Sequence, residues 1–367
     1  MINPLFWQGK TVLITGHTGF KGSWLALWLQ QLNANVIGFA LPAKTSPNLF
    51  YLANVAHRMT NIEGDICDYA LLHEVIEKYK PEIIIHMAAQ SLVRYSYQQP
   101  VETYATNLMG TLHLLEAARH QQNHIRVIIN VTSDKCYENK DQGCDFKESD
   151  PLGGHDPYSS SKACAELVTA AYRDSYFKLS QTLGVATVRA GNVIGGGDWA
   201  DDRLIPDFVR ACLQQQKCVI RYPDAIRPWQ HVLDPLYGYL VLAEKLYIEP
   251  NRYAEAWNFG PNEAGAKPVK WITEYLAALW GDNSPSIIMT AQKSPHEAQY
   301  LKLDCSKTQA KLKWKPHWPL EKALAETVNW YKKYQLGHDL QAVSLAQIAD
   351  YQSNVIGSTI KESHANS

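Results

Sequence analysis

Two short segments in the middle of the chain carry side chains that can move protons. The first contains Ser133, Asp134 and Lys135, and the second contains Tyr158 and Lys162. Tyr158 and Lys162 stand four residues apart and would share one face of a helix. Because a nearby ammonium group favours a phenolate, Lys162 is expected to lower the pKa of Tyr158. Such a phenol can take a proton from a hydroxyl group while a hydride leaves the same carbon.

A glycine-rich segment near the N-terminus predicts a dinucleotide site. It directly follows the apolar run 11–15, and its three glycines permit a tight turn and a close approach of backbone to pyrophosphate. The N-terminus of the helix that follows would bind phosphate. The predicted contacts are Gly16, His17, Thr18, Gly19, Phe20, Lys21 and Gly22.

The end of the second expected strand, 35–39, does not discriminate between NAD and NADP. It lacks the acidic residue that binds the ribose of NAD, and it also lacks an arginine for a 2′-phosphate. Asp65, after the third expected strand, is a candidate contact for adenine. Its alternative role is to cap a loop.

Apolar runs alternate with helical patterns through the first half of the chain. This alternation predicts an α/β fold, a doubly wound Rossmann-type parallel sheet with right-handed crossovers. Asp156 and Pro157 would begin the helix that carries Tyr158. Strands are expected at 11–15, 35–39, 59–62, 83–85 and 126–131, and helices at 24–32, 69–80 and 101–121.

The composition changes near residue 190, after which glycine, proline, tryptophan and arginine interrupt shorter elements. We therefore expect a dinucleotide-binding domain over 1–190. Residues 191–340 would form mainly a smaller α/β C-terminal substrate lobe, with some segments returning to the first domain. Residues 341–367 are expected to be a C-terminal tail.

The bulk composition excludes several classes of function. A net charge of −1 offers no electrostatic basis for binding nucleic acid or an anionic membrane. No run of 18 apolar residues and no signal-peptide pattern is present. The seven scattered cysteines are read as reduced thiols, which favours a cytoplasmic protein, and we expect no metal site.

Taken together, the chain resembles the extended short-chain dehydrogenase/reductase family over nearly its whole length. The resemblance implies that Tyr158 is the acid/base, that Lys162 holds the nicotinamide ribose and that Ser133 binds the reacting hydroxyl. It also implies further cofactor contacts. The residues that carry the resemblance are Gly16, Gly19, Gly22, Asp65, the run 86–90, Asn107, Tyr158, Lys162 and Arg189. The further cofactor contacts that it implies are Asp65, Ile66, Ala88, Ala89, Gln90 and Asn107.

Asp134 and Lys135 resemble the acid and base of the nucleotide-sugar 4,6-dehydratase branch of that family. Such enzymes oxidise carbon 4, eliminate water across carbons 5 and 6, and return the hydride to carbon 6, so that NAD is recycled. Most of the branch has a glutamate where this chain has Lys135. A lysine can be the base only if its pKa is lowered, and otherwise it stabilises the enolate as a cation. Both roles stay open.

Lys135 resembles the residue that the members acting on CDP-glucose have at this position. The segments 16–24, 133–137, 189–199 and 227–232 resemble these members as well. Trp199 and Trp229 could either stack on the nucleotide base or pack within the second lobe. The resemblance also implies a homodimer or homotetramer, paired through helices near 101–121 and 158–180, and a role in making deoxysugars for lipopolysaccharide O-antigen. The expected substrate contacts are Arg94, Asn192, Trp199, Arg203, Arg221, Arg227 and Trp229.

Three alternatives share parts of this pattern. A nucleotide-sugar 4-epimerase would have Tyr158 and Lys162 but no need for Asp134 and Lys135. A decarboxylase acting on a nucleotide uronate could use Lys135 for the substrate carboxylate. A catalytically silent dinucleotide-binding regulator would have lost Tyr158 or Lys162, and both are present.

Overall fold

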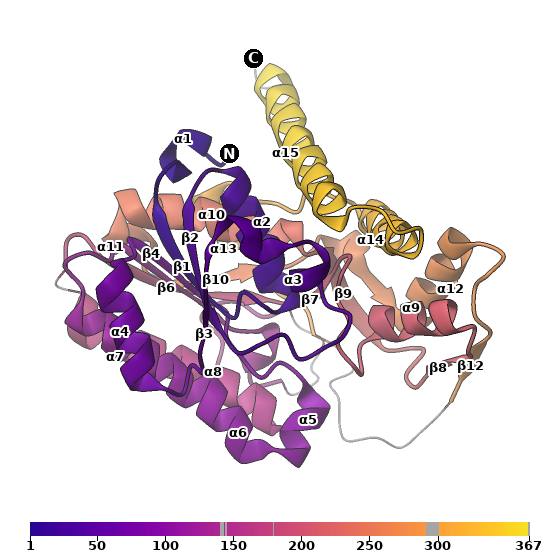
Figure 1. The fold of residues 1–367 in the computed structure, drawn as a ribbon, viewed down its shortest axis with the longest axis horizontal. Coiled ribbons are helices and arrows are strands. Elements are labelled where there is room, and N and C mark those ends of the chain that lie inside the picture. Colours follow the sequence, from indigo (N-terminus) through magenta and orange to yellow (C-terminus); the bar gives the residue numbers. More distant parts are fainter. Residues whose placement is uncertain (140–142, 144, 179, 291–300, 366–367) are drawn as a thin grey trace.

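A parallel sheet forms the centre of the molecule (Figure 1). The computed structural model describes residues 1–139, 143, 145–178, 180–290 and 301–365. Within these residues, seven strands pair in the order β10-β6-β5-β4-β1-β2-β3, and every pairing is parallel. This order confirms the predicted doubly wound sheet. The strands are β1 Thr11–Thr15, β2 Asn35–Ala40, β3 Thr60–Glu63, β4 Ile83–His86, β5 Val127–Val131, β6 Gly184–Ala190 and β10 Ala256–Phe259.

Helices cover both faces of this sheet (Figure 1). Helices α2 (Phe20–Gln31) and α10 (Leu233–Ile248) pack on one face. Helices α4 (Tyr69–Tyr79), α7 (Gly110–His120) and α8 (Pro157–Tyr172) lie together on the other. Side chains alternate across a strand. Val12 and Ile14 therefore belong to one buried apolar cluster and Leu13 to the other.

The helix expected at 101–121 is interrupted. It consists of α6 (Pro100–Tyr104), a π-helical turn (Ala105–Met109) and α7. The turn directs Asn107 inward, where its Oδ1 accepts a hydrogen bond from the Gln90 amide (2.9 Å) and its Nδ2 donates one to the Gln90 carbonyl (3.0 Å). Single π turns frequently occur at functional sites. Here the turn fastens the loop that follows β4.

The second lobe is discontinuous in sequence. Strands β7 (Asn192–Ile194), β9 (Ile226–His231) and β11 (Ala266–Pro268) form one small sheet. Strands β8 (Cys218–Ile220) and β12 (Ile287–Met289) form another, beside α9 (Leu204–Gln214) and α12 (Val269–Trp280) (Figure 1). Several segments of the range 191–340, among them α10 and β10, return to the large sheet. The remaining helices are α1 Pro4–Trp7, α3 Leu49–Leu52, α5 Val93–Gln98, α11 Pro250–Tyr253, α13 Ser306–Leu312 and α14 Leu320–Gln335, with shorter helical turns at Val55–Arg58, Asp134–Cys136, Arg173–Phe177 and Glu263–Gly265.

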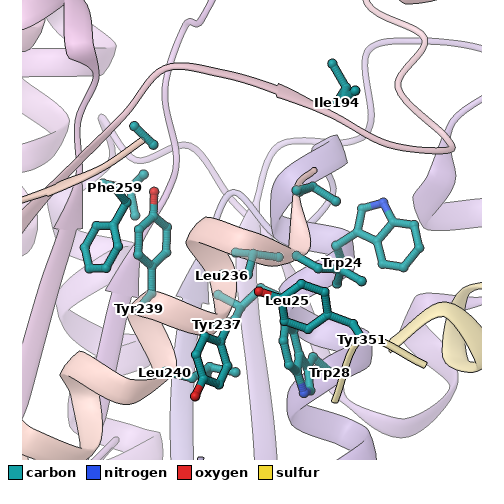
Figure 2. Packing of buried hydrophobic residues seen from close by; sticks show 14 of the residues in the cluster. Trp24, Leu25, Trp28, Ile194, Leu236, Tyr237, Tyr239, Leu240, Phe259 and Tyr351 are labelled. Atoms are coloured by element: carbon teal, nitrogen blue, oxygen red, sulfur yellow. The ribbon is translucent and has the colours of Figure 1, made fainter. Parts of the chain in front are cut away.

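The expected C-terminal tail is wrong as a description of residues 341–365. They belong to a long helix, α15 (Leu340–Ala365), whose far end extends away from the body of the molecule (Figure 1). Tyr351 is fully buried, and its ring meets Trp28 of α2 edge to face at 5.7 Å (Figure 2). Helix α15 thus packs on α2, and the contact with Tyr351 contributes to the burial of Trp28. None of the helices in the described part of the chain has the length and apolar character needed to cross a membrane.

Candidate active site

The glycine loop between β1 and α2 has the geometry of a pyrophosphate site. Gly16 has a φ of +76°, and a Cβ there would lie 2.7 Å from the amide nitrogen of Ala88. A Cβ on Gly22 would lie 2.3 Å from the Gly16 carbonyl oxygen, so helix and strand can approach only without a side chain. A Cβ on Gly19 would meet only that oxygen, at 3.4 Å, among the described atoms. The first turn of α2 therefore faces open space, as phosphate binding requires.

A single cleft of about 1060 Å³ runs from this loop to the second lobe. It collects nearly all of the predicted site residues. The lining includes Gly16, Thr18, Gly19, Phe20, Lys21, Gly22, Asp65, Ile66, Ala88, Ala89, Gln90, Arg94, Ser133, Asp134, Lys135, Tyr158, Lys162, Asn192, Trp199, Arg203, Arg221, Arg227 and Trp229.

Two predicted cofactor contacts, His17 and Asn107, are not among the described residues that line the cleft. The imidazole of His17 is fully buried, and its Nε2 lies 2.6 Å from Asn61 Oδ1. A Cβ on Gly38 would fall 2.4 Å from the His17 ring, so a glycine in β2 makes room for it. Burial lowers the pKa of His17. His17 and Asn107 therefore support neighbouring segments, His17 through Asn61 and Asn107 through Gln90.

The residues predicted to move protons meet on one wall of the cleft. Strand β5 ends at Val131, and Ser133 caps the short turn that follows by accepting a hydrogen bond from the Lys135 amide (3.2 Å). On the facing helix, Asp156 caps α8 by accepting a hydrogen bond from the Ser159 amide (2.9 Å). This confirms the predicted helix start. The caps at the two segments bring Ser133, Asp134 and Lys135 opposite Tyr158 and Lys162.

The expected lowering of the Tyr158 pKa is wrong for this structure. Burial raises that pKa to about 12, while a hydrogen bond with Ser133 and the positive charge of Arg203 oppose the rise. Burial also lowers the pKa of Lys162 to about 8, and its Nζ donates a hydrogen bond to the Val131 carbonyl (3.2 Å). Both shifts follow from the cost of placing a charge in a poorly solvated wall. The spacing of Tyr158 and Lys162 in the sequence does not reveal how deeply the pair is buried.

Two other groups in the same wall have shifted pKa values. Burial raises the pKa of Asp134 to about 6, although Lys135, Ser133 and Arg227 act in the opposite direction. Burial, with the positive charge of Lys162, lowers the pKa of Lys21 to about 7. The ammonium of Lys21 donates a hydrogen bond to the Tyr239 hydroxyl (2.8 Å). An aspartic acid that titrates near pH 6 can donate a proton close to neutral pH.

Cations from both lobes gather at the outer part of the cleft. Arg203, just before α9, pairs with Asp198 (2.9 Å) and donates a hydrogen bond to Ser91 Oγ (3.1 Å) across the cleft. Arg94 of α5 and Arg221 both bind Oδ1 of Asp202, at 3.2 and 2.9 Å. The sequence reasoning missed the three partner residues, because Arg94 and Asp202 are 108 positions apart and Arg203 and Ser91 are 112 apart. Of these partners, only Asp198 lies in one of the segments that carry the family resemblance, the segment 189–199.

The two tryptophans of the second lobe that were predicted to contact substrate are largely buried. Trp199 is 5% exposed and packs edge to face on Tyr331 and Tyr334 of α14, at 5.2 and 5.1 Å. Trp229 is 6% exposed and donates a hydrogen bond to the Lys267 carbonyl (3.2 Å). Both border the cleft, yet most of each ring is packed within the lobe.

The glycine loop follows the first strand of a doubly wound sheet, and Tyr158 and Lys162 lie one turn apart on α8 in the same cleft. This is the arrangement of the extended short-chain dehydrogenase/reductases. The comparison with sequence families is more specific. The chain belongs to the GDP-mannose 4,6 dehydratase family, whose model matches residues 13–327.

Individual relatives agree with this assignment. The CDP-glucose 4,6-dehydratase of Salmonella typhimurium is 51% identical over 357 residues, 96% of this chain and 99% of the relative. The dTDP-glucose 4,6-dehydratase of Haemophilus influenzae is 29% identical and covers 87% of this chain and 97% of its own. A solved dTDP-glucose 4,6-dehydratase from Bacillus anthracis, in complex with NAD, superposes with a TM-score of 0.74 at 26% identity, covering 89% of this chain and 98% of that one.

Proposed function

We propose that this protein is an NAD-dependent nucleotide-sugar 4,6-dehydratase, a hydro-lyase that converts CDP-glucose to CDP-4-keto-6-deoxyglucose and water. The observation that carries the proposal is the presence of Asp134 and Lys135 beside Ser133, Tyr158 and Lys162 in one cleft with a dinucleotide loop. The Salmonella relative, similar over almost the whole of both chains, supports CDP-glucose as the substrate.

The residues of the cleft fit NAD. The loop from Gly16 to Gly22 offers backbone and a helix N-terminus to the pyrophosphate, and Asp65 and Ile66 line the part of the cleft where the adenosine half would lie. When bound, NAD would supply a hydride acceptor for carbon 4 of the sugar and a hydride donor for carbon 6. Dehydratases of similar fold that were solved with NAD support this cofactor over NADP.

In the oxidation step, Tyr158 removes the proton of the 4-hydroxyl group. Burial opposes formation of the phenolate, and the hydrogen bond with Ser133 and the positive charge of Arg203 favour it. Ser133 lies within hydrogen-bonding reach of the tyrosine and orients the same hydroxyl group. Lys162 holds the nicotinamide ribose from the next turn of α8.

In the elimination step, the 4-keto group acidifies the hydrogen on carbon 5. Lys135 either removes this proton or stabilises the enolate that forms. Asp134, protonated up to about pH 6, gives a proton to the hydroxyl group on carbon 6, which leaves as water. Return of the hydride to carbon 6 and of a proton to carbon 5 would complete the reaction, whose net change is the loss of one water.

The outer part of the cleft would hold the diphosphate. Arg227 of β9 is 9% exposed and interacts electrostatically with Asp134. Arg94, Arg203 and Arg221 line the same cleft from both lobes. Arginine suits this task because its planar fork matches phosphate oxygens. Asn192 of β7 would add a neutral donor.

Turnover in heavy water tests the proposal. The purified protein is incubated with NAD and with CDP-, dTDP-, UDP- or GDP-glucose, and the products are followed by NMR. We expect a 4-keto-6-deoxy sugar from CDP-glucose, with one deuterium at carbon 5. A 4-epimer without deuterium at carbon 5 would show an epimerase instead, and the absence of any 4-keto product would reject the dehydratase.

We further propose a homodimer or homotetramer, a cytoplasmic location and a role in deoxysugar synthesis for lipopolysaccharide O-antigen. Apolar side chains on the helices expected to pair support self-association. Met109 is 41% exposed, Leu167 58% and Tyr176 51%. Sedimentation equilibrium of the wild type and of Leu167→Glu would test this. A monomeric wild type would contradict it.

A further inference from the structure

A buried ion pair lies directly behind the proton-moving residues. Glu166 follows Lys162 by one helical turn and Tyr158 by two, so it continues the same face of α8. Its carboxylate accepts a hydrogen bond from Arg189 Nη2 of β6 at 2.8 Å, and each side chain is only 3% exposed. Neither residue is among the described residues that line the cleft. The pair therefore cannot act by touching the substrate.

Glu166 ties α8 to the ends of two strands. Its Oε1 accepts a hydrogen bond from the hydroxyl of Thr132, the residue immediately before Ser133. Its Oε2 accepts from Thr187 Oγ1 (2.7 Å) as well as from Arg189. Both oxygens are thus engaged, as the burial of a carboxylate requires.

Arg189 holds the other end of the same segment. Its Nη1 donates a hydrogen bond to the Tyr137 hydroxyl (2.7 Å), and its guanidinium lies over the Tyr137 ring at 4.8 Å. Tyr137 comes directly after the turn Asp134–Cys136, and its hydroxyl in turn donates to Asn258 Oδ1 (2.7 Å). The residues 133–136 are consequently bracketed, with Thr132 bound to Glu166 on one side and Tyr137 bound to Arg189 on the other.

We propose that Glu166 is a positioning residue for the dehydratase reaction, which with Arg189 clamps both ends of the segment carrying Ser133, Asp134 and Lys135 against the helix face carrying Tyr158 and Lys162. The inference rests on the proposed function. Reacting groups must be held to within a fraction of an ångström, so loosening this clamp slows chemistry more than it weakens binding.

The clamp also provides a negative charge beside Lys162. Glu166 acts to raise the pKa of Lys162, against the larger lowering by burial. Loss of the carboxylate therefore lowers that pKa further, and Lys162 loses its proton at a lower pH. The other titratable groups that interact with Lys162 come from the glycine loop, from β4 and from the turn after β5, and are Lys21, His86 and Cys136.

Glu166→Gln tests the inference, because glutamine keeps the size of the side chain but loses the charge and one of the two acceptor oxygens that Thr132, Thr187 and Arg189 share. The matched control is Glu244→Gln, the same change at a carboxylate of α10 that binds Trp7 Nε1 (2.8 Å) away from the cleft. Rates of cofactor reduction and of product formation, KM for CDP-glucose, their pH profiles and the melting temperature are measured for the wild type and both variants.

We expect Glu166→Gln to lower kcat for cofactor reduction by about tenfold or more, with KM within about twofold, since the variant disturbs alignment and not the substrate contacts. The alkaline limb of the pH profile for cofactor reduction, which we assign to loss of the Lys162 proton, should move to lower pH. Glu166→Asp, which retains the charge, should restore the position of that limb. Glu244→Gln should change only the melting temperature.

Tyr137→Phe provides a second, milder variant that removes only the hydroxyl held by Arg189. It should lower kcat in the same way, even if Glu166→Gln proves too unstable to purify. Wild-type pH profiles and an unchanged kcat in Tyr137→Phe and in any folded Glu166 variant would overturn the inference. A wild type that forms no 4-keto sugar would instead reject the proposed function, so the two failures can be told apart.

Discussion

The α-carbon of Gly191 faces the carboxylate of Asp134 so closely that a Cβ at this position would lie 2.8 Å from Asp134 Oδ2. Any side chain here must displace the carboxylate, which is buried and borders the cleft. We therefore predict that Gly191→Ala slows elimination by about tenfold or more while cofactor reduction changes little, because an error of position of about 1 Å is costly to catalysis. Single-turnover measurements of reduced cofactor and of 4-keto product separate the two steps.

The control for this change is Gly357→Ala in α15, where a Cβ would meet nothing within 4 Å. It should leave both steps at the wild-type rate. Equal slowing of oxidation and elimination in Gly191→Ala would show that the alanine disturbs the whole wall and not Asp134 in particular.

Lys135 borders both the main cleft and a small adjoining pocket, and replacing it should separate oxidation from elimination. We predict that Lys135→Ala reduces elimination by about 10²–10⁴-fold, the usual range for a positioned acid or base, and cofactor reduction much less. Reduced cofactor should then accumulate when CDP-glucose is added. Equal losses in both steps would indicate that Lys135 only shapes the site.

Lys135→Arg distinguishes the two roles proposed for this lysine. Arginine keeps the positive charge but does not release its proton in the range of interest. If Lys135 stabilises the enolate as a cation, Lys135→Arg should retain far more elimination than Lys135→Ala. If Lys135 removes the proton from carbon 5, both variants should fail equally.

The pKa of Asp134 predicts the pH dependence of elimination. Burial raises this pKa to about 6, so the carboxyl group is protonated below that pH and loses its proton above it. If the protonated form is the acid, elimination should fall by about tenfold per pH unit above 6. Asp134→Asn should abolish this slope and leave a low rate. A wild-type elimination rate that rises between pH 6 and 8 would contradict the assignment.

Local patterns were sufficient to predict five of the seven strands of the large sheet, β1 to β5, together with the glycine loop and the helix of Tyr158, whereas β6 and β10 were not predicted. In each case the determining contacts lie within a few residues, as with Asp156 capping the helix three residues on. The cleft wall as a set was also predictable, because the carboxyl ends of parallel strands meet at one edge of a sheet.

Features that depend on distant contacts could not be predicted. The raised pKa of Tyr158 results from burial by several elements, and the sequence shows only its neighbour Lys162. The Glu166–Arg189 pair joins α8 to β6, and neither residue has a local partner that would mark it. The packing of α15 on α2 brings together Tyr351 and Trp28, which no local periodicity relates.

This C-terminal contact leads to a prediction about stability. Asp234 of α10 is fully buried, and its Oδ1 accepts hydrogen bonds from the Tyr351 hydroxyl and the His317 amide, both at 2.7 Å. Among the described residues its Oδ2 has no hydrogen-bond partner. Burial raises the pKa of Asp234 from 3.8 to about 7, and the hydrogen bonds only partly oppose this.

The sign of the pH effect follows from that shift. Between about pH 4 and pH 7 the unfolded chain has released the Asp234 proton and the folded protein has not, so the free energy of unfolding falls by up to about 1.4 kcal/mol per pH unit from this group. Asp234→Asn removes the titration and keeps an oxygen for Tyr351 and His317. We therefore predict that Asp234→Asn is more stable than the wild type at pH 8 and that the difference disappears near pH 4. Urea unfolding at both pH values measures it, with Asp350→Asn, an exposed carboxylate on α15 paired with Lys322, as the control. A difference that does not depend on pH would contradict the prediction, because the buried carboxylate would then not titrate in the folded protein.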